Sequence, residues 1–523
     1  MSSINSRRDF LKFLGYGSLT LSQLNLLQSC TNSKFSAEKL PSSKDDVVLA
    51  DGLNYYKIIS WNDPINPSEV FGFNNDYIDI QELSSTELIM WINHEYANPL
   101  FVSGIERTKI NIDKERSLVG DSLIQVNKQG SRWIFEKNSP YNRGVRSYTK
   151  ILFANNVSVK GSKIVEGTLA NCAGGKTPWN TFLSCEENYD AFYGERDLAT
   201  GKIKYLKNST NWHKFYPENM PEHYGWVVEI DPYTGSAQKH TNLGRFAHES
   251  ATCAQSKDSN VVVYSGDDKA DECLYKFVSN SKNDLKEGIL YVANIEQGKW
   301  LPLDLILSPV LKEYFDTQLD VVTYARGAAK IVGGTGLNRP EDIEIHPYTG
   351  DIFVALTNNK KKNDWHGSIL KISEKDGLHT STEFTSEIFK FGGAAEGFSS
   401  PDNLAFDKQG NLWMVTDISG GIGKGVYRQF KNNGLFLVPN KGKHAGKTIQ
   451  VGSAPNDAEF TGLCFSLDEK TLFLSVQHPG ERTKDLNNPT SHWPDGGIPK
   501  PSVIAIHGDF LEQYTQDSVT AYS

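Results

Sequence analysis

Residues 341–357 read EDIEIHPYTGDIFVALT: an apolar strand, a short polar turn and a second apolar strand. The same pattern recurs in DNLAFDKQGNLWMVT at 402–416 and TGLCFSLDEKTLFLSVQ at 461–477, and more loosely at 226–240 and 122–135. The turns of the three closest copies are 61 residues apart. Single hairpins occur in any β-protein, but hairpins repeated at such a spacing are typical of a β-propeller. Because the spacing exceeds that of a usual blade, we expect insertions between the strands.

The rest of the chain also reads as all-β. Short apolar or alternating runs are separated by Gly, Asn, Asp and Pro turns, and few long helical patterns occur. The segment 301–333 is the main helical candidate. We expect a single β-propeller domain over residues 49–523, preceded by a polar, Ser/Lys-rich tether over residues 31–48.

The N-terminus has the pattern of an export signal. Residues 6–12 read SRRDFLK, and a modest apolar run follows to about residue 27, which predicts a twin-arginine signal peptide over residues 1–30. That route carries proteins that fold before crossing, often because they load a metal or cofactor first. The run ends in LLQSC, so Cys30 could receive lipid, but Gln28 is not the usual small residue and this point stays open. We expect a periplasmic protein, or one anchored by lipid to the outer membrane, after contact with the twin-arginine machinery.

Charge and cysteine content narrow the class of protein. The net charge of −9 argues against nucleic-acid binding, because no basic surplus exists to displace counterions, and it suits a protein that gathers cations. Besides Cys30 there are five cysteines, an odd number without a CxxC metal pattern. A monomer is expected.

Carboxylates stand at the start of two repeated hairpins. RPED at 339–342 precedes one, and SPDN at 400–403 precedes another. The innermost strands of a propeller line its channel, so acids from several blades would meet at one mouth of that channel. Unpaired, they would repel one another, and a shared cation would relieve the repulsion. The alternative is that both motifs are ordinary turn formers.

A second acidic segment contains a thiol. In TPWNTFLSCEEN at 177–188 a predicted strand ends in Cys185 beside two glutamates, which should raise the thiol pKa and favour metal ligation over nucleophilic attack. A buried structural cysteine is the alternative. No HExxH, Walker or GxSxG pattern occurs. A set rich in carboxylates and poor in histidine favours hard cations such as Ca²⁺ or Fe³⁺, with one thiolate. Other acidic segments are NHE at 93–95, AHES at 247–250, GDD at 266–268 and DEC at 271–273.

Together these motifs resemble the PhoX-type alkaline phosphatases, over nearly the whole chain after the signal. The resemblance implies a six-bladed propeller with insertions, with iron (Fe³⁺) and several Ca²⁺ ions at the mouth of its central channel. The twin-arginine signal also matches that family. The motifs are FGFNNDY (71–77), NHEY (93–96), SPYNR (139–143), GTLANCAGGKTPWNTFLSCEEN (167–188), GRFAHESA (244–251), GDDKADECLYKF (266–277), NRPEDIEIHP (338–347) and SPDNLAFD (400–407).

The resemblance also implies roles for individual residues. Cys185 would ligate iron, and Arg339 would contact phosphate. Residues 269–273 and 142–145 depart from the family pattern, which puts substrate contacts in doubt more than metal binding. The other implied metal ligands are Glu249, Glu272 and Glu341, with Glu95, Glu186 and Asp402 as further ones, and the other implied phosphate contacts are Arg143 and Arg326.

Three functions remain open at this point. The first is a metal-dependent alkaline phosphatase that releases phosphate from small phosphate monoesters outside the cytoplasm. The second is a calcium-dependent propeller hydrolase of the phosphotriesterase or lactonase type, which would have no use for a thiolate. The third is a propeller that binds a ligand without catalysis.

Overall fold

The computed structural model describes residues 40–255, 260–418 and 420–515. The predicted signal peptide at 1–30 and Cys30 lie outside these residues. Within them the chain forms six antiparallel or mixed sheets, the blades I to VI, and a small two-stranded hairpin. The prediction of an all-β, six-bladed propeller with insertions is confirmed.

The first three blades come from the N-terminal half of the chain, and their strands are given from the innermost outward. Blade I contains β3 (Asn75–Ser84), β4 (Glu87–His94), β5 (Gly120–Gln129) and β6 (Arg132–Phe135), with β7 (Arg143–Arg146) also paired to β5. Blade II contains β10 (Asn171–Lys176), β11 (Phe182–Glu186), β14 (Val227–Ile230), β15 (Ala237–His240), β8 (Lys150–Phe153) and β9 (Ile164–Glu166). Blade III contains β16 (His248–Gln255), β17 (Val261–Asp267), β18 (Leu274–Ser279), β19 (Gly288–Asn294) and β20 (Lys299–Pro302).

The other three blades begin with the repeated hairpins, and two of them recruit N-terminal strands. Blade IV contains β21 (Pro340–Ile345), β22 (Ile352–Leu356), β23 (Ser368–Glu374) and β24 (Phe384–Phe391). Blade V contains β25 (Pro401–Phe406), β26 (Leu412–Thr416), β27 (Gly434–Val438), β28 (Ile449–Ser453) and β1 (Val48–Leu49). Blade VI contains β29 (Glu459–Phe465), β30 (Leu472–Gln477), β31 (Ser502–His507) and β2 (Asn54–Ser60).

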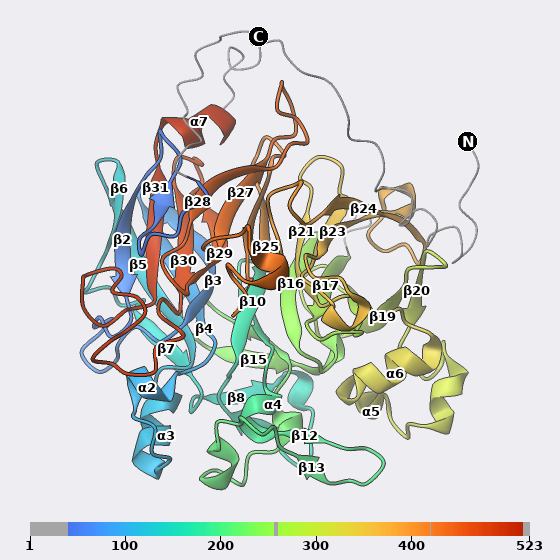
Figure 1. The fold of residues 1–523 in the computed structure, drawn as a ribbon. Coiled ribbons are helices and arrows are strands. Elements are labelled where there is room, and N and C mark those ends of the chain that lie inside the picture. Colours follow the sequence, from blue (N-terminus) through green and yellow to red (C-terminus); the bar gives the residue numbers. More distant parts are fainter. Residues whose placement is uncertain (1–39, 256–259, 419, 516–523) are drawn as a thin grey trace. The chain divides into compact units, whose positions relative to one another are not determined.

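The hairpin repeat marks the inner part of three consecutive blades. The segments 341–357, 402–416 and 461–477 each supply the innermost strand of a blade and the next strand outward. The looser copies at 226–240 and 122–135 also form hairpins, but they lie further out in their blades. The six innermost strands contact one another in a closed ring, in the order β3, β10, β16, β21, β25 and β29 (Figure 1).

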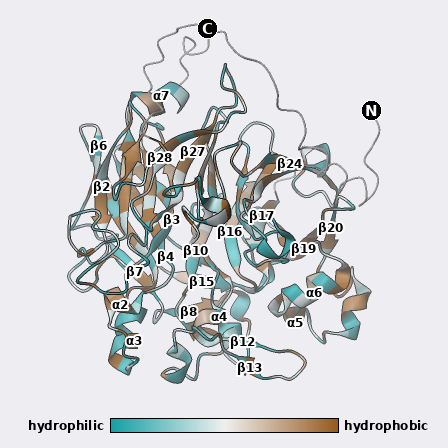
Figure 2. Ribbon diagram, in the orientation of Figure 1, coloured by the Kyte–Doolittle hydropathy of each residue, from teal (hydrophilic) through white to brown (hydrophobic). Residues whose placement is uncertain are grey.

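Most of the hydrophobic core lies between neighbouring blades. Leu183, Phe246 and Val292 belong to a buried cluster between blades II and III, and Met90 and Val503 belong to another between blades I and VI. Strands that are buried on both faces carry near-continuous apolar runs, and in Figure 2 the blade strands carry most of the brown colour.

Three insertions lie at one end of the propeller, the lower end in Figure 1. They follow β4, β11 and β20. The prediction of helix at 301–333 is confirmed for α5 and α6, although its first residues belong to β20. Their helices and hairpin are α2 (Pro99–Val102), α3 (Lys109–Arg116), α4 (Asp190–Tyr193), β12 (Glu195–Arg196), β13 (Ile203–Lys204), the 3₁₀ turn η6 (Pro309–Glu313), α5 (Gln318–Thr323) and α6 (Ala325–Val332).

Both ends of the described chain pack on the blades. Helix α7 (Asp509–Thr515) follows the last strand. The predicted tether is wrong for residues 40–48, because Ser42 and Val47 are buried and the Ser42 amide donates to Ser453 Oγ at 3.1 Å. Among the described residues, no helix is both long and apolar enough to cross a membrane.

Candidate functional site

A strongly acidic pocket of about 180 Å³ opens where the innermost strands begin. Ten carboxylates line it, together with one thiol and one guanidinium group. Such a set of like charges in one small space is unfavourable unless protons or cations neutralise it. The lining residues are Asp76, Glu95, Tyr96, Cys172, Glu187, Asn188, Glu249, Asp268, Arg339, Glu341, Asp402, Asp417, Glu459, His478 and Glu481.

Five blades supply a side chain to the pocket from the second residue of their innermost strand. These residues are Asp76, Cys172, Glu249, Glu341 and Asp402, on β3, β10, β16, β21 and β25. In each blade the pairing with the next strand shifts register at or directly after this residue. A bulge of this kind bends the strand and redirects a side chain, and here the same device recurs around the ring.

The backbone before these residues is also unusual. On four of the strands, the residue two positions earlier has a left-handed conformation, with φ between 48° and 56°. That conformation is uncommon for non-glycine residues and typically persists only where surrounding structure enforces it. The four residues are Asn74, Ala170, Arg339 and Ser400.

Cys172 lies at the centre of the carboxylates. Its Sγ is 3.2 Å from Asp76 Oδ2 and 3.4 Å from Glu249 Oε1. Ligand atoms of Asp76, Glu95 and Cys172 lie within 4.8 Å of one another, and so do those of Cys172, Glu187 and Glu249. The thiol is therefore shared by two groups of potential metal ligands.

The donor atoms fit metal ions. Asp76 Oδ1, Glu187 Oε1 and Glu459 Oε2 are buried and have no hydrogen-bond partner among the described residues. Burial raises the pKa of Asp76 to about 6, and burial together with the Asp76 charge raises the pKa of Glu95 to about 7. A buried carboxylate oxygen without a partner destabilises the folded protein, and a bound hard cation would provide that partner. The thiolate suits a transition metal.

Arg339 supplies the positive charge of the pocket. Its Nε and Nη2 donate to Asp268 Oδ1 and Oδ2, each at 2.8 Å, and Nη2 lies 2.7 Å from Glu341 Oε1. Burial raises the pKa of Asp268, but the neighbouring guanidinium outweighs that effect and holds this pKa below its usual range. The side chain of Arg339 is 28% exposed, so it is held firmly yet reaches the open part of the pocket.

Polar residues at the rim complete the site, and none of them was predicted to have a role. Asn188 Nδ2 donates to Glu187 Oε2 at 2.6 Å, and Lys269 donates to Asn188 Oδ1. His478 Nε2 lies 2.9 Å from Glu459 Oε1. His478 and Glu459 flank the third repeated hairpin, and this position was the signal that could have identified them.

The pocket brings together five of the predicted site residues. Glu95, Glu249, Glu341, Asp402 and Arg339 all line it. They come from four blades, I, III, IV and V, and are up to 307 positions apart in the chain, from 95 to 402. The expectation that acids at the starts of inner strands converge is therefore confirmed for these side chains.

The prediction for Cys185 is wrong, since its side chain lies in the apolar cluster between blades II and III. Strand β11, which carries it, is the second strand of blade II, and Cys185 does not line the pocket. Cys172 on β10 is the thiol of the pocket. It stands two residues after the left-handed Ala170, as Glu341 stands after Arg339, and this correspondence is visible only in the structure.

The prediction for Glu186 is also wrong by one residue. Glu186 Oε1 accepts from Lys239 Nζ at 2.7 Å, and Oε2 accepts from the Gly225 and Trp226 amides at 3.0 and 3.1 Å. Consecutive side chains of an extended strand point in opposite directions, so Glu187 faces the pocket instead.

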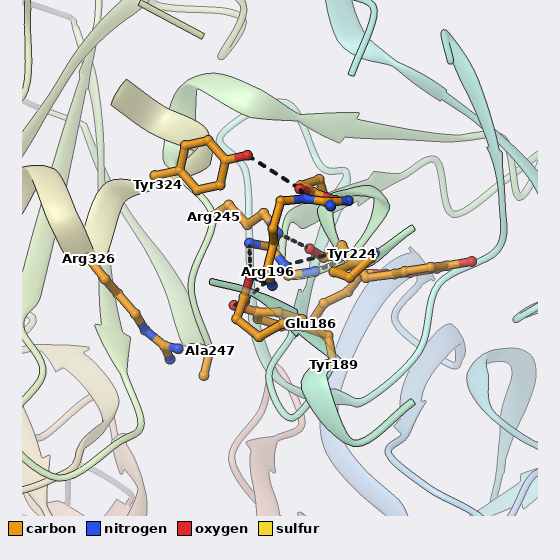
Figure 3. Close-up of polar contacts among 12 residues, drawn as sticks. Glu186, Tyr189, Arg196, Tyr224, Arg245, Ala247, Tyr324 and Arg326 are labelled. Carbon is orange, nitrogen blue, oxygen red and sulfur yellow. Dashed lines mark hydrogen bonds and ion pairs between the residues drawn. The ribbon is translucent and has the colours of Figure 1, made fainter. Parts of the chain in front are cut away.

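Glu272, Arg326 and Arg143 lie outside the pocket as well. Glu272 pairs with Lys330 at 2.6 Å, and Arg326 binds Asp267 through two hydrogen bonds. Arg143 donates to three backbone carbonyl groups near the surface. In Figure 3, Glu186 lies near Tyr224 and Arg245, whereas Arg326 points toward Ala247.

Comparison with known proteins identifies the family. A sequence profile described as alkaline phosphatase PhoX matches residues 35–480. A solved structure of Pseudomonas fluorescens PhoX, in complex with the transition-state analogue vanadate, is 29% identical with a TM-score of 0.82, over 92% of this chain and 98% of that chain. A Dyadobacter fermentans protein of unknown function is 10% identical with a TM-score of 0.42, over 88% of this chain and 100% of that chain. None of the curated protein sequences compared with the chain matches it significantly.

These matches decide among the three functions that the sequence left open. The profile covers most of the chain, and the P. fluorescens structure shares the fold over nearly its whole length, so the chain is an alkaline phosphatase of the metal-dependent type. PhoX proteins are generally exported. The propeller with its acidic, thiol-containing pocket belongs to the PhoX family of alkaline phosphatases.

Proposed function

We propose that this phosphatase binds Fe³⁺ and Ca²⁺ together in the channel-mouth pocket and hydrolyses small phosphate monoesters there. The observation that carries the proposal is the position of Cys172, a thiol within 3.4 Å of two carboxylates whose neighbours include unsatisfied oxygens. Carboxylates alone suit Ca²⁺, whereas a thiolate among them favours a transition metal such as iron.

The ligand set follows from the same geometry. Cys172, Asp76 and Glu249 would hold the iron, and the surrounding acids would hold Ca²⁺. When bound, such ions neutralise charge on the phosphoryl oxygens and activate the attacking water. The pocket acids proposed to hold Ca²⁺ are Glu95, Glu187, Glu341, Asp402 and Glu459.

Arg339 would bind the substrate phosphate. Its Nε and Nη2 are fixed by Asp268 and Glu341, which leaves Nη1 to donate to a non-bridging phosphoryl oxygen. Because the guanidinium is already oriented, little side-chain entropy is lost on binding. Vanadate in the P. fluorescens relative supports phosphoryl transfer as the chemistry.

The substrates and location are proposed more broadly. The small, polar pocket suits a phosphate group whose ester substituent remains outside it, so small monoesters of varied structure would serve. We place the enzyme in the periplasm or on the outer membrane after twin-arginine export, as a monomer. Lipid on Cys30 would decide between the free and the anchored form.

Metal analysis with an activity assay tests the proposal. Purified protein should contain both iron and calcium, and it should hydrolyse p-nitrophenyl phosphate only when Ca²⁺ is present. Calcium without iron would contradict the mixed set of ions. Arg339→Lys should raise KM for the ester and the inhibition constant of inorganic phosphate about tenfold or more. A lysine has no planar guanidinium group that can bind the two acids and a phosphate oxygen at the same time. Unchanged values would overturn the role given to Arg339.

A further inference from the structure

We propose that Arg326, on insertion helix α6, is a positioning residue for phosphate binding, although it lies outside the pocket. It would act through Asp267 on the neighbouring pair of Asp268 and Arg339. The proposal rests on the role given above to Arg339 as a phosphate contact.

The first step is the contact between Arg326 and Asp267. Arg326 Nε donates to Asp267 Oδ2 at 2.7 Å, and Nη2 donates to Oδ1 at 2.5 Å. Asp267 is fully buried at the end of β17, and its Oδ1 also accepts from the Ala247 amide at 3.3 Å. A bidentate pair to a planar guanidinium fixes the direction as well as the position of the carboxylate.

The second step is the direct connection along the chain from Asp267 to Asp268, which lines the pocket. Asp268 follows Asp267 and carries its side chain to the pocket, where both carboxylate oxygens accept from Arg339. The Asp268 amide donates to the Ala247 carbonyl at 3.0 Å, so the turn is also held against the segment that leads to Glu249. A shift of Asp267 would therefore move the partner that orients Arg339.

The third step concerns what holds Arg326 itself. Helix α6 belongs to the insertion between β20 and β21, and the Arg245 amide donates to the Val322 carbonyl of α5 at 2.8 Å. In Figure 3 the guanidinium of Arg326 points toward Ala247. Arg326 thus links helix α6 to Asp267, and a displacement of this side chain would be transmitted to Arg339.

The test uses full-length, metal-loaded enzyme and four changes: Arg326→Lys, Arg326→Gln, the neutral pair Asp267→Asn with Arg326→Gln, and Lys330→Gln. Lys330 lies one turn along α6 and, among the described residues, forms an ion pair only with Glu272, so it is the matched control. The neutral pair avoids leaving a buried carboxylate without its partner. For each variant, kcat and KM for p-nitrophenyl phosphate, the inhibition constant of inorganic phosphate and the iron and calcium content are measured.

We expect Arg326→Gln and the neutral pair to lower kcat/KM about 10- to 100-fold and to weaken phosphate inhibition about tenfold, with the metal content unchanged. Arg326→Lys should recover part of the loss, and Lys330→Gln should resemble the wild type. In an Arg339→Lys background, Arg326→Gln should cause less than about a twofold further loss, because both changes affect one contact.

Other outcomes separate the two hypotheses. If Arg339→Lys impairs phosphate binding but Arg326→Gln does not, or if the two losses multiply, the proposal for Arg326 is wrong and the role of Arg339 stands. If Arg339→Lys leaves phosphate inhibition unchanged, both are wrong.

Discussion

Cys172 and Cys185 show how much the surroundings of a residue decide at the scale of one side chain. Both are thiols on adjacent strands of blade II, yet one lies among carboxylates and the other among Leu183, Val227 and Phe246. Burial raises the pKa of both thiols well above the usual value, and neighbouring acids raise it further. A bound cation could stabilise a thiolate only at Cys172, where ligands surround it.

Substitution of the two cysteines should separate their roles. Cys172→Ser should lower phosphatase activity about 100-fold or more and remove most of the iron, because the pocket loses its only thiol. Cys185→Ala should keep iron and activity but lower the free energy of unfolding by about 1–2 kcal/mol through a small core cavity. Metal analysis, turnover and urea unfolding of both variants check this. If Cys185→Ala lost iron while Cys172→Ser kept it, the assignment of Cys172 as the iron ligand would be refuted.

The adjacent glutamates should differ in the same way. Glu186→Gln leaves Lys239 buried without its charged partner, so the free energy of unfolding should fall by about 3–5 kcal/mol. Glu187→Gln should instead reduce turnover at saturating substrate while the unfolding midpoint of metal-free protein stays the same or rises, because one repelling carboxylate is removed. Adding Lys239→Met to Glu186→Gln should recover most of the lost stability. If Glu186→Gln and Glu187→Gln lowered turnover equally, the conclusion that Glu187 rather than Glu186 faces the pocket would be wrong.

At the scale of the element, a hairpin turn far from the pocket holds a buried carboxyl group that destabilises the fold when it ionises. Glu469 lies in the turn between β29 and β30, 5% exposed and with φ at 49°. Its Oε1 accepts from the Lys408 amide at 2.8 Å, while Oε2 is buried without a partner among the described residues. Burial raises the pKa of this carboxyl to about 7.

The Glu469 carboxyl should make stability depend on pH. Because its folded pKa exceeds the ordinary 4.5, the folded state retains a proton that the unfolded state has lost, and stability falls as pH rises from 4.5 through 7. Glu469→Gln keeps the acceptor and cannot ionise. Its free energy of unfolding should exceed that of the wild type by about 2 kcal/mol at pH 8, and the difference should shrink toward pH 5. Urea unfolding at both pH values in the presence of chelator tests this; a constant difference would argue against ionisation of Glu469.

At the scale of the whole molecule, the ring of blades is closed by strands from opposite ends of the chain. Strand β2 near the N-terminus pairs with β31, from Asn54 opposite His507 to Ser60 opposite Ser502. Without that pairing, blade VI would present an open edge at β31, and part of its apolar interface with blade I would be exposed. The pocket receives Asp76 from blade I and Glu459 from blade VI, so it depends on this closure.

Truncation should test the closure. A chain ending at residue 501 lacks β31 and α7 but none of the lining residues of the pocket. We expect it to lose cooperative thermal unfolding and Ca²⁺ binding, because blade VI cannot complete its sheet. A chain ending at residue 515 keeps every described strand and should unfold and bind Ca²⁺ like the full chain. Circular dichroism and calorimetric titration distinguish these results. Normal Ca²⁺ binding by the shorter chain would show that closure is not required.

Local patterns in the sequence predicted local structure well. The hairpins at 341–357, 402–416 and 461–477 formed as expected, since apolar runs on either side of a polar turn are a local signal for two paired strands. The acids beside the prolines at 340 and 401 were placed correctly because they begin these hairpins. The tether was predicted too long, because composition does not reveal that Ser42 finds Ser453.

The sequence by itself determined the strands, their hairpin repeat and, through its motifs, the family. The tertiary structure decided which thiol, which of two adjacent glutamates and which arginine reach the pocket. Strand periodicity turns each neighbour to the opposite face, and a register shift of one residue reverses that choice. Only the closed ring then brings side chains from residue 76 to residue 481 into one space, where Cys172 rather than Cys185 stands among the carboxylates.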